Sequence, residues 1–280
     1  MGQTGIVSLL IIILTFVFSY RGFTNRSFYE NHLFHVDKVL INRDYKRIVT
    51  SGFLHVGWMH LIFNMLALFF FSSSMEYFLG PFLFLLIYFF SLICGNLFAL
   101  FVHRRHSSYT SVGASGAIAG IIFGSIILFP DSSISLFFLP IRFPAWLFGL
   151  LYMLYSIYGI RSKKSNIGHE AHLGGGVAGM LLMTILYPKM VFDNPLPLFL
   201  ILVPSLIFII IIIYKPHVLM VDNLFYKKQH NYTVDDRYNI QKKNTQEEVD
   251  RILEKISKKG MKSLTKKEKD ILNAYSKKIR

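Results

Sequence analysis

The chain is poor in charge and contains a single cysteine. Only 16% of its 280 residues are charged, whereas 53% are hydrophobic and 16% are aromatic. So little charge fits a protein with several membrane spans better than a soluble domain. The one cysteine, Cys94, excludes a disulfide within the chain, and it does not identify the redox compartment.

Signals for cleavage or lipid attachment are also missing near the start. No Lys or Arg precedes the apolar run at residues 5–20, and no small-residue cleavage pattern follows it. Ile6 excludes the myristoylation pattern. We therefore expect residues 5–20 to be a retained first transmembrane helix.

Long apolar runs make up most of the chain as far as Tyr214. A membrane helix needs about 20 apolar residues, and we expect such helices over residues 5–20, 59–79, 82–102, 113–129, 144–160, 170–187 and 195–214. Seven spans are predicted, with six as the alternative. The fourth and sixth runs are short and rich in glycine, which predicts central helices with close neighbours. The expected fold class is an all-α polytopic membrane protein.

The segment after Tyr214 has a different character. It holds 17 of the 30 Lys and Arg, interleaved with nine acidic residues. Thr245 to Glu248 and Thr265 to Glu268 both have the capping-box pattern, and apolar residues at helical spacing follow each one. This predicts a basic soluble tail with a short helical hairpin. The mixed charges argue against a nucleic-acid partner, and the net charge of +14 favours anionic lipid headgroups. The sequence identifies no partner for the tail.

One hydroxyl stands out in the apolar part, within Gly113-Ala-Ser-Gly116. The small neighbours of Ser115 would let a substrate backbone approach its hydroxyl, as a nucleophile requires. The spacing of Gly116 and Gly120 also fits a plain helix-packing face. Taken alone, the motif favours the packing interpretation.

His60 and Asn64 are four residues apart and therefore share one helix face. Polar side chains at membrane depth are costly, and they face a cavity or a partner. The two residues either form interhelical hydrogen bonds that hold the bundle together, or donate to a developing negative charge. The pair alone favours the first interpretation.

His172 lies at the start of the sixth run, and Gly175 and Gly179 follow it on the same helix face. These glycines allow a neighbouring helix to come unusually close. We expect His172 to reach Ser115 and to act as its general base. Glu170 projects to a different side of the helix, so we assign no acid as a third member.

A metal site is the main alternative use of these histidines, because His169 and His172 are three residues apart. The apolar runs offer almost no carboxylate or thiolate to complete such a site, and no His-Glu-x-x-His pattern occurs. We therefore expect neither a metal ion nor a cofactor.

These motifs follow one another in a fixed order. They are Phe53-Leu54-His55, His60-x-x-x-Asn64, Glu76 with Gly80, Gly113-Ala-Ser-Gly116, and Ala171-His172-x-x-Gly175-x-x-x-Gly179. In order and spacing the set resembles the rhomboid family of intramembrane serine proteases, over residues 40–187. Each motif is weak by itself, but the ordered set is specific.

The resemblance implies a six-helix core with a water-filled cavity. It further implies a serine endopeptidase that cleaves transmembrane or juxtamembrane segments of other membrane proteins, with no cofactor. Ser115 would be the nucleophile and His172 the base, while His60, Asn64 and the Ser115 backbone N–H would hold the oxyanion. Residues with structural roles near the site would be Gly113, Gly116, Gly175, Gly179 and Glu76.

Two features depart from the family pattern. Many rhomboids carry an aromatic residue four positions after the serine, against which the histidine packs, and this chain has Ala119 there. Another group must then orient His172. The last apolar run and the tail also lie outside a six-helix core. We expect a rhomboid-like membrane core over 1–190, an additional transmembrane helix over 191–218 and the soluble tail over 219–280.

The main alternative function is a catalytically inactive rhomboid-like protein that binds membrane helices. Retention of Ser115 and His172 argues against it. A transporter would need ionisable residues deep in several spans, which the chain largely lacks.

We expect a multi-pass protein of the bacterial inner membrane. Eleven Lys and Arg in the loops on the Ser115 side, against two on the other, favour a cytoplasmic site, whereas the resemblance favours the opposite orientation.

Overall fold

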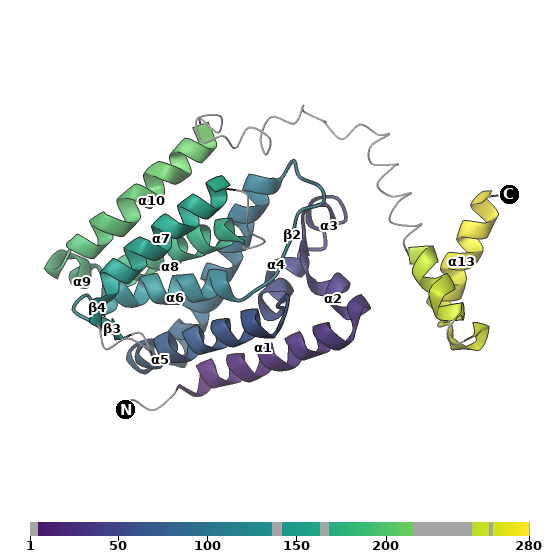
Figure 1. Ribbon diagram of the computed structural model, residues 1–280, viewed down its shortest axis with the longest axis horizontal. Coiled ribbons are helices and arrows are strands. Elements are labelled where there is room, and N and C mark those ends of the chain that lie inside the picture. The colour runs from purple at the N-terminus through teal and green to yellow at the C-terminus, as the bar shows by residue number, and fades with distance from the viewer. Residues whose placement is uncertain (1–4, 136–141, 163–167, 215–247, 258–259, 280) are drawn as a thin grey trace. The chain divides into compact units, whose positions relative to one another are not determined.

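The computed structural model describes residues 5–135, 142–162, 168–214, 248–257 and 260–279. The chain forms two compact units, divided between Lys227 and Lys228. The first unit is a bundle of helices, and the second is a small helical hairpin (Figure 1). We describe each unit by itself.

Helix α1 (Ile6–Thr24) lies along the outside of the bundle and is fixed at its start by an acid from another helix. The Glu76 carboxylate accepts hydrogen bonds from the backbone N–H groups of Val7 and Ser8, at 2.8 and 2.7 Å. An anion at this position satisfies N–H groups that have no partner within the helix, and it complements the helix dipole. Side chains at helical spacing form the buried face of α1: Ser8, Ile11, Thr15 and Ser19.

Helix α5 (Trp58–His103) consists of two helical halves that meet at Gly80. The backbone of Gly80 has a φ of 74°, which glycine adopts without steric cost, and Pro81 starts the second half. The two ends of α5 return to one end of the bundle, because His60 contacts the Gly113 segment and His103 contacts Glu170. The break at Gly80 therefore reverses the chain, and it falls between the predicted helices at 59–79 and 82–102.

Between α1 and α5 the chain forms a structured loop. Its elements are α2 (Arg26–His32), β1 (Phe34–His35), α3 (Val36–Leu40), α4 (Arg47–Thr50) and the 3-10 turn η1 (Ser51–Phe53). The Arg47 side chain is only 5% exposed, and it donates to the carbonyls of Glu30 and Leu33, both at 2.8 Å. Strand β1 pairs antiparallel with β2 (Thr110–Ser111), with Phe34 opposite Ser111.

Helices α6 (Ser115–Leu128) and α8 (His169–Leu186) form the centre of the bundle and pack against each other and against α5. Every residue of α6 after Ser115 is buried, as expected for a short, glycine-rich central helix. The backbones meet at glycines: a Cβ at Gly179 would lie 2.5 Å from the Cα of Gly120. Larger side chains at these positions would force the two helices apart.

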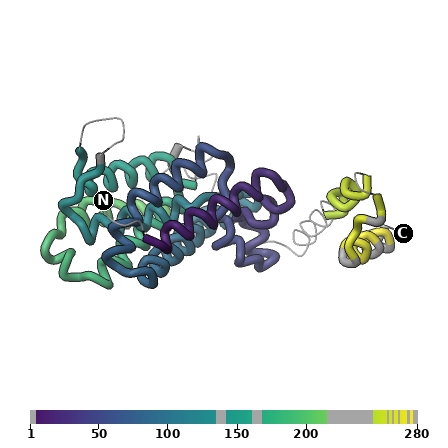
Figure 2. Tube along the Cα trace, turned by 90° about the horizontal axis from the view of Figure 1, so that it is seen from below, coloured from purple at the N-terminus to yellow at the C-terminus, as the bar shows by residue number. Residues whose placement is uncertain are grey.

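The remaining helices of this unit pack on α6 and α8, on the side of the bundle away from α1 (Figure 1), and α1 lies in front when the bundle is seen from below (Figure 2). A short antiparallel pair, β3 (Ser133–Ser135) and β4 (Arg142–Pro144), leads into α7 (Ala145–Ser162). Helix α9 (Pro188–Asp193) then leads into α10 (Leu196–Tyr214), which packs on α7 and α8. Gly149 of α7 allows this contact, because a Cβ there would lie 3.0 Å from the Ile201 side chain.

Each apolar run of the sequence contains a helix. By length and composition, three of the described helices are able to cross a membrane, namely α1, α5 and α10. Helix α6 and residues Ala145–Ile160 are shorter apolar helices. The protein is thus mainly helical with several apolar helices, and its two short strand pairs lie between helices.

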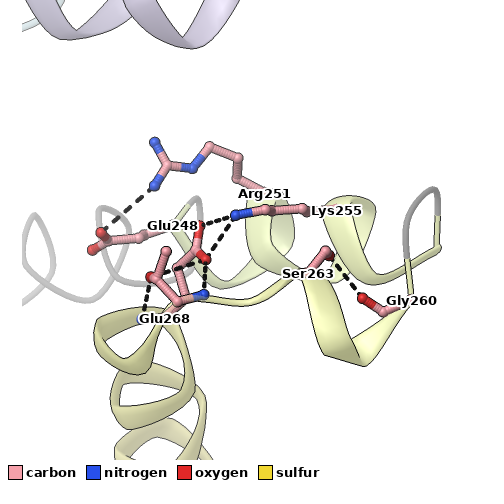
Figure 3. A network of polar contacts seen from close by, with 7 residues as sticks. Glu248, Arg251, Lys255, Gly260, Ser263 and Glu268 are labelled. Carbon is pink, nitrogen blue, oxygen red and sulfur yellow. Dashed lines mark hydrogen bonds and ion pairs between the residues drawn. The ribbon is translucent and has the colours of Figure 1, made fainter.

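The tail unit contains a helix over residues 248–257, the turn η3 (Met261–Ser263) and α13 (Lys266–Ile279). The predicted capping box at its second helix is present: the Thr265 backbone N–H donates to Glu268 Oε2 at 2.7 Å, and the Glu268 N–H donates to Thr265 Oγ1 at 3.3 Å. Lys255 Nζ also donates to both Glu268 oxygens at 2.8 Å (Figure 3). Thr245 of the first predicted box lies outside the described residues.

Candidate active site

Ser115 is the first residue of α6, and the turn before it is held in place from two sides. Gly113 has a φ of 134°, a conformation that side chains other than glycine rarely adopt. Its N–H donates to the Ser51 carbonyl at 3.0 Å, and the Ala114 N–H donates to His55 Nε2 at 3.5 Å. These contacts fix the half-buried Ser115 at the helix start, where its own N–H has no partner within the helix.

Helix α6 is short for a membrane helix. Fourteen residues form a helix about 21 Å long, whereas the hydrocarbon core of a bilayer is about 30 Å thick. A helix of this length cannot reach both surfaces.

The imidazole of His172 reaches Ser115 across the contact between α8 and α6. Its Nε2 lies 2.6 Å from Ser115 Oγ, which is hydrogen-bonding distance. The helices come close enough for this contact because a Cβ at Gly116 would already lie 3.0 Å from the Ala171 carbonyl oxygen. Gly175 faces the Gly116 backbone in the same contact, and a Cβ there would come even closer to the Gly116 carbonyl oxygen. The predicted glycines of both helices thus meet where the serine and the histidine meet.

No acid completes a triad among the described residues. His172 Nδ1 is buried, and it has no hydrogen-bond partner in the described part of the chain. Glu170 instead turns to the end of α5, where its Oε1 lies 3.0 Å from His103 Nε2 and both side chains are less than 10% exposed. The structure therefore provides a pair, with the second imidazole nitrogen held by packing alone.

His60 lies close to the Gly113 turn. A Cβ at Gly113 would lie 3.2 Å from His60 Nε2 and 3.5 Å from Ser115 Oγ. The missing side chain thus leaves a small space that both groups border. An atom in that space would be within reach of a hydroxyl and a ring nitrogen, the geometry that an acyl-transfer site needs.

Asn64 lies one helical turn beyond His60 and is 7% exposed. Its Nδ2 donates one hydrogen to the His60 carbonyl at 2.9 Å. An amide nitrogen carries two hydrogens, so one remains for another acceptor. The two residues share a helix face, as their spacing predicts.

Glu76 lies away from the serine, although it was predicted among the residues near the site. Its carboxylate binds the start of α1, and Met75 beside it packs towards Gly124 near the end of α6, whereas Ser115 lies at the start of that helix. The position is therefore structural, and it belongs to the opposite end of the bundle from His172.

The sequence did not reveal three contacts around the site. Tyr152 of α7 stacks on the His172 ring, with centroids 5.8 Å apart and planes 17° from parallel. Ser19 Oγ lies 2.9 Å from His55 Nδ1 and so orients the ring that supports Ala114. Both are pairings between distant segments, which leave no signal at a fixed spacing in one sequence.

The third contact closes the loop before Ser115. The ring of Tyr109 stacks on His103, with centroids 3.5 Å apart and planes at 9°. Burial and the neighbouring Glu170 carboxylate raise the pKa of Tyr109 far above its ordinary value, so this phenol remains neutral. His103, Tyr109 and Glu170 together join the end of α5, the loop and the start of α8.

Metal binding was the alternative use of the histidines. In the described residues, no three His, Cys, Asp or Glu side chains lie close enough together to hold an ion. His169 instead packs on α7, where its ring meets Tyr155 edge to face at 5.1 Å.

The fold and the site define a helical membrane protein in which a serine and a histidine from two packed helices meet. The family described as Rhomboid domain matches residues 42–189, more than half of the chain. The chain belongs to the rhomboid family. A second match, over residues 232–278, is to a family of unknown function (DUF6576).

Known proteins agree with this membership. Rhomboid protein 1, mitochondrial, of Saccharomyces cerevisiae is 35% identical over 150 residues, which is 51% of this chain and 43% of that protein. Rhomboid protease GluP of Bacillus subtilis is 32% identical over 143 residues, 51% of this chain and 26% of its own length. Inactive RHOMBOID-like protein 8 of Arabidopsis thaliana is 36% identical over 85 residues, 30% of this chain and 24% of its own.

The chain thus spans less than half the length of these relatives, and their names cover both active and inactive proteins. Family membership and the apolar helices support an integral membrane protein. The predicted bacterial inner membrane gains no support, because the relatives include a mitochondrial protein of Saccharomyces cerevisiae as well as a protein of Bacillus subtilis.

Proposed function

We propose that the protein is an intramembrane serine endopeptidase that cleaves transmembrane or juxtamembrane segments of other membrane proteins. The observation that carries the proposal is the 2.6 Å separation of His172 Nε2 and Ser115 Oγ at the start of a short buried helix. A serine hydroxyl becomes a strong nucleophile only when an adjacent base takes its proton, and a neutral imidazole suits that task.

In the proposed reaction, Ser115 Oγ attacks the carbonyl carbon of the scissile peptide bond while His172 Nε2 accepts the hydroxyl proton. The carbonyl oxygen becomes an oxyanion in the space beside Gly113. His60, Asn64 and the Ser115 N–H are the donors proposed for it. His172 then protonates the leaving amine, and a water deprotonated by the same base hydrolyses the acyl-enzyme.

A substrate helix must unwind locally before this reaction can occur. In an intact helix each carbonyl is already hydrogen-bonded within the segment. Transmembrane segments with helix-breaking residues, and with small side chains at the cleaved bond, are therefore the proposed substrates. The reaction requires no cofactor.

The proposed architecture has a six-helix catalytic core over residues 1–190 and an additional membrane helix over 191–218, with α10 as that seventh span. The basic tail over 219–280 follows as a separate soluble part. Membrane proteins and membrane lipids are the proposed partners, and nucleic acid is not among them.

The alternative is a catalytically inactive relative that binds membrane helices. One relative carries the word inactive in its name, so similarity to known relatives is compatible with this alternative too. The two proposals differ in one respect that an experiment can measure, namely whether a bound substrate is cut.

The test is co-expression with a panel of tagged single-span reporters whose helices contain small and helix-breaking residues. The protein should yield two fragments from at least one reporter, and Ser115→Ala and His172→Ala should abolish them. Ser125→Ala is the matched control, because this buried serine on the same helix donates only to the Ile122 carbonyl. Cleavage that persists in either variant of the pair would refute the mechanism, and binding without cleavage would favour the inactive alternative.

A further inference from the structure

Tyr152 of α7 lies flat against the imidazole of His172. The ring centroids are 5.8 Å apart and the planes differ by 17°, so the two faces are almost parallel. Offset stacking of this kind is a favourable aromatic arrangement. The contact joins α7 to the residue of α8 that reaches Ser115.

Besides Tyr152, the His169 ring meets the His172 ring edge to face at 5.8 Å, but hydrogen bonds restrain the His172 ring little. Its Nδ1 has no hydrogen-bond partner in the described part of the chain, and its Nε2 contacts only the Ser115 hydroxyl that it is proposed to deprotonate. The last torsion of a histidine is broad rather than confined to sharp wells. Without an acid on Nδ1, the plane of the ring must be set by what packs on its face.

Tyr152 is itself held firmly enough to do this. Phe123 of α6 meets its ring edge to face at 6.0 Å, and Phe148, one turn earlier on α7, stacks near it at 6.2 Å and 10°. The Tyr152 carbonyl accepts a hydrogen bond from Ser156 Oγ at 2.9 Å. The tyrosine is therefore placed before any substrate binds.

The sequence of α6 explains why the stacked ring comes from another helix. Ser115, Ala119 and Phe123 are four residues apart and lie on one face of the helix. Ala119 contributes a single methyl between the serine and the phenylalanine that touches Tyr152. Ala119 therefore offers no ring to stack on His172, and the ring that does so comes from α7.

We propose that Tyr152 is the positioning residue of the catalytic base: its ring holds the His172 imidazole in the plane that directs Nε2 at Ser115. The role rests on the proposed protease function. It also makes the orientation of the base depend on the place of α7 against α8. Helix α7 is held in that place by α10, whose Ile201 packs at Gly149.

The test uses the full-length protein in detergent and a rhodamine-labelled fluorophosphonate, which reacts with an activated serine and needs no natural substrate. The variants are Tyr152→Leu and Tyr152→Phe, with Tyr155→Leu as the matched control. Tyr155 lies on the same helix and is 50% exposed, and its ring meets His169 instead of His172. Saturation kinetics separate the maximal inactivation rate from the probe concentration at half saturation.

Tyr152→Leu should lower the maximal rate by roughly ten- to a hundredfold, the cost of a misplaced catalytic group, while half-saturation stays within about twofold because the probe pocket is unchanged. Tyr152→Phe should keep the rate within about threefold, since the stacking face remains. Tyr155→Leu should react like the wild type. A full rate in Tyr152→Leu, or an equal loss in Tyr155→Leu, would overturn the proposal.

A second measurement tests, independently of reactivity, whether the Tyr152 ring stacks on the His172 ring. In the 1H–13C spectrum of ring-labelled protein, assigned by His172→Gln, the His172 Cε1–H resonance should carry an upfield ring-current shift. Tyr152→Leu should remove the shift, and Tyr152→Phe should keep it. If the wild type fails to label at all, the protease proposal fails, and the spectrum still shows whether the Tyr152 ring stacks on His172. An unchanged spectrum in Tyr152→Leu would overturn the positioning role whatever the labelling result.

Discussion

Gly120 and Gly179 meet backbone to backbone where α6 crosses α8. A Cβ at Gly179 would lie 2.5 Å from the Gly120 Cα, a distance that no side-chain rotation can relieve because the neighbour is main chain. The contact lies one to two turns beyond Ser115 and His172 on the same two helices. The close approach of these backbones is what allows a serine and a histidine from separate helices to be 2.6 Å apart.

A methyl group at Gly179 should therefore act on both stability and catalysis. Gly179→Ala should force the helices apart and cost about 1–3 kcal/mol in the free energy of unfolding. It should also lower the reaction rate roughly a hundredfold by moving His172 from Ser115. Thermal unfolding in detergent and fluorophosphonate labelling measure the two effects. Gly57→Ala is the control, because a Cβ there meets nothing within 4 Å; equal behaviour of the two variants would contradict the account.

Glu76 should matter for stability and not for the chemical step. Glu76→Gln removes the charge that accepts the Val7 and Ser8 N–H groups, at a cost of about 1–2 kcal/mol. The labelling rate of the folded fraction should not change, since this carboxylate binds the start of α1. Denaturant titration and labelling give the two values. Ser73→Ala, which loses only an exposed bond to the Phe69 carbonyl, is the control; a slower rate in folded Glu76→Gln would place the acid in the site after all.

The buried His103 and Glu170 pair should show strong coupling. His103→Leu leaves Glu170 with Tyr109 as its partner, whereas Glu170→Leu leaves the buried His103 Nε2 without the carboxylate, and each should cost about 1–3 kcal/mol. The double variant should cost less than the sum, with an interaction free energy above about 1 kcal/mol. Unfolding free energies of the four proteins give this value directly. Additive costs would mean that the 3.0 Å contact does not anchor the start of α8.

The tail hairpin should lose protection in acid. The Lys255 ammonium, together with the Thr265 N–H, lowers the pKa of Glu268 from 4.5 to about 2. A lowered pKa stabilises the folded form above pH 4.5, and this contribution falls as the pH drops from 4.5 towards 2. The protection factor of the Lys269 N–H, the first bond of α13, is the exchange rate of an unstructured amide at the same pH divided by its own rate; it should therefore fall over this range in the full chain.

Glu268→Gln is the control for that experiment, because it keeps a hydrogen-bonding oxygen at the capping position without the titrating charge. Its protection should start lower and change little between pH 4.5 and 2. An identical acid dependence in both proteins would show that Glu268 is not the group responsible.

Hydropathy predicted where the helices lie, since each apolar run of the sequence coincides with a helix to within a few residues. The run at 113–129, for example, contains α6, and its start at Ser115 follows from the glycine turn. Burial in a membrane leaves this signal in composition. Helix pairing does not, because contacts between α7 and α8 depend on which faces meet in three dimensions.

The candidate site likewise has residues that the sequence predicts and one that only the structure reveals. Ser115, His60 and His172 were predicted from the ordered set of motifs and its resemblance to the rhomboid family, since two of the motifs, taken alone, favoured helix packing. Tyr152 was not found, because the sequence showed only that Ala119 could not supply a ring. The partner that fills this place comes from α7 and becomes evident only from the stacked geometry.

The most direct test of the central claim is the position of the covalent adduct after reaction with the fluorophosphonate. Peptide mass spectrometry of the labelled protein should find the phosphonate on Ser115 alone, at a stoichiometry that falls to background in His172→Ala. An adduct on Ser125, or full labelling of Ser115 in the absence of the His172 imidazole, would contradict a Ser115–His172 catalytic pair.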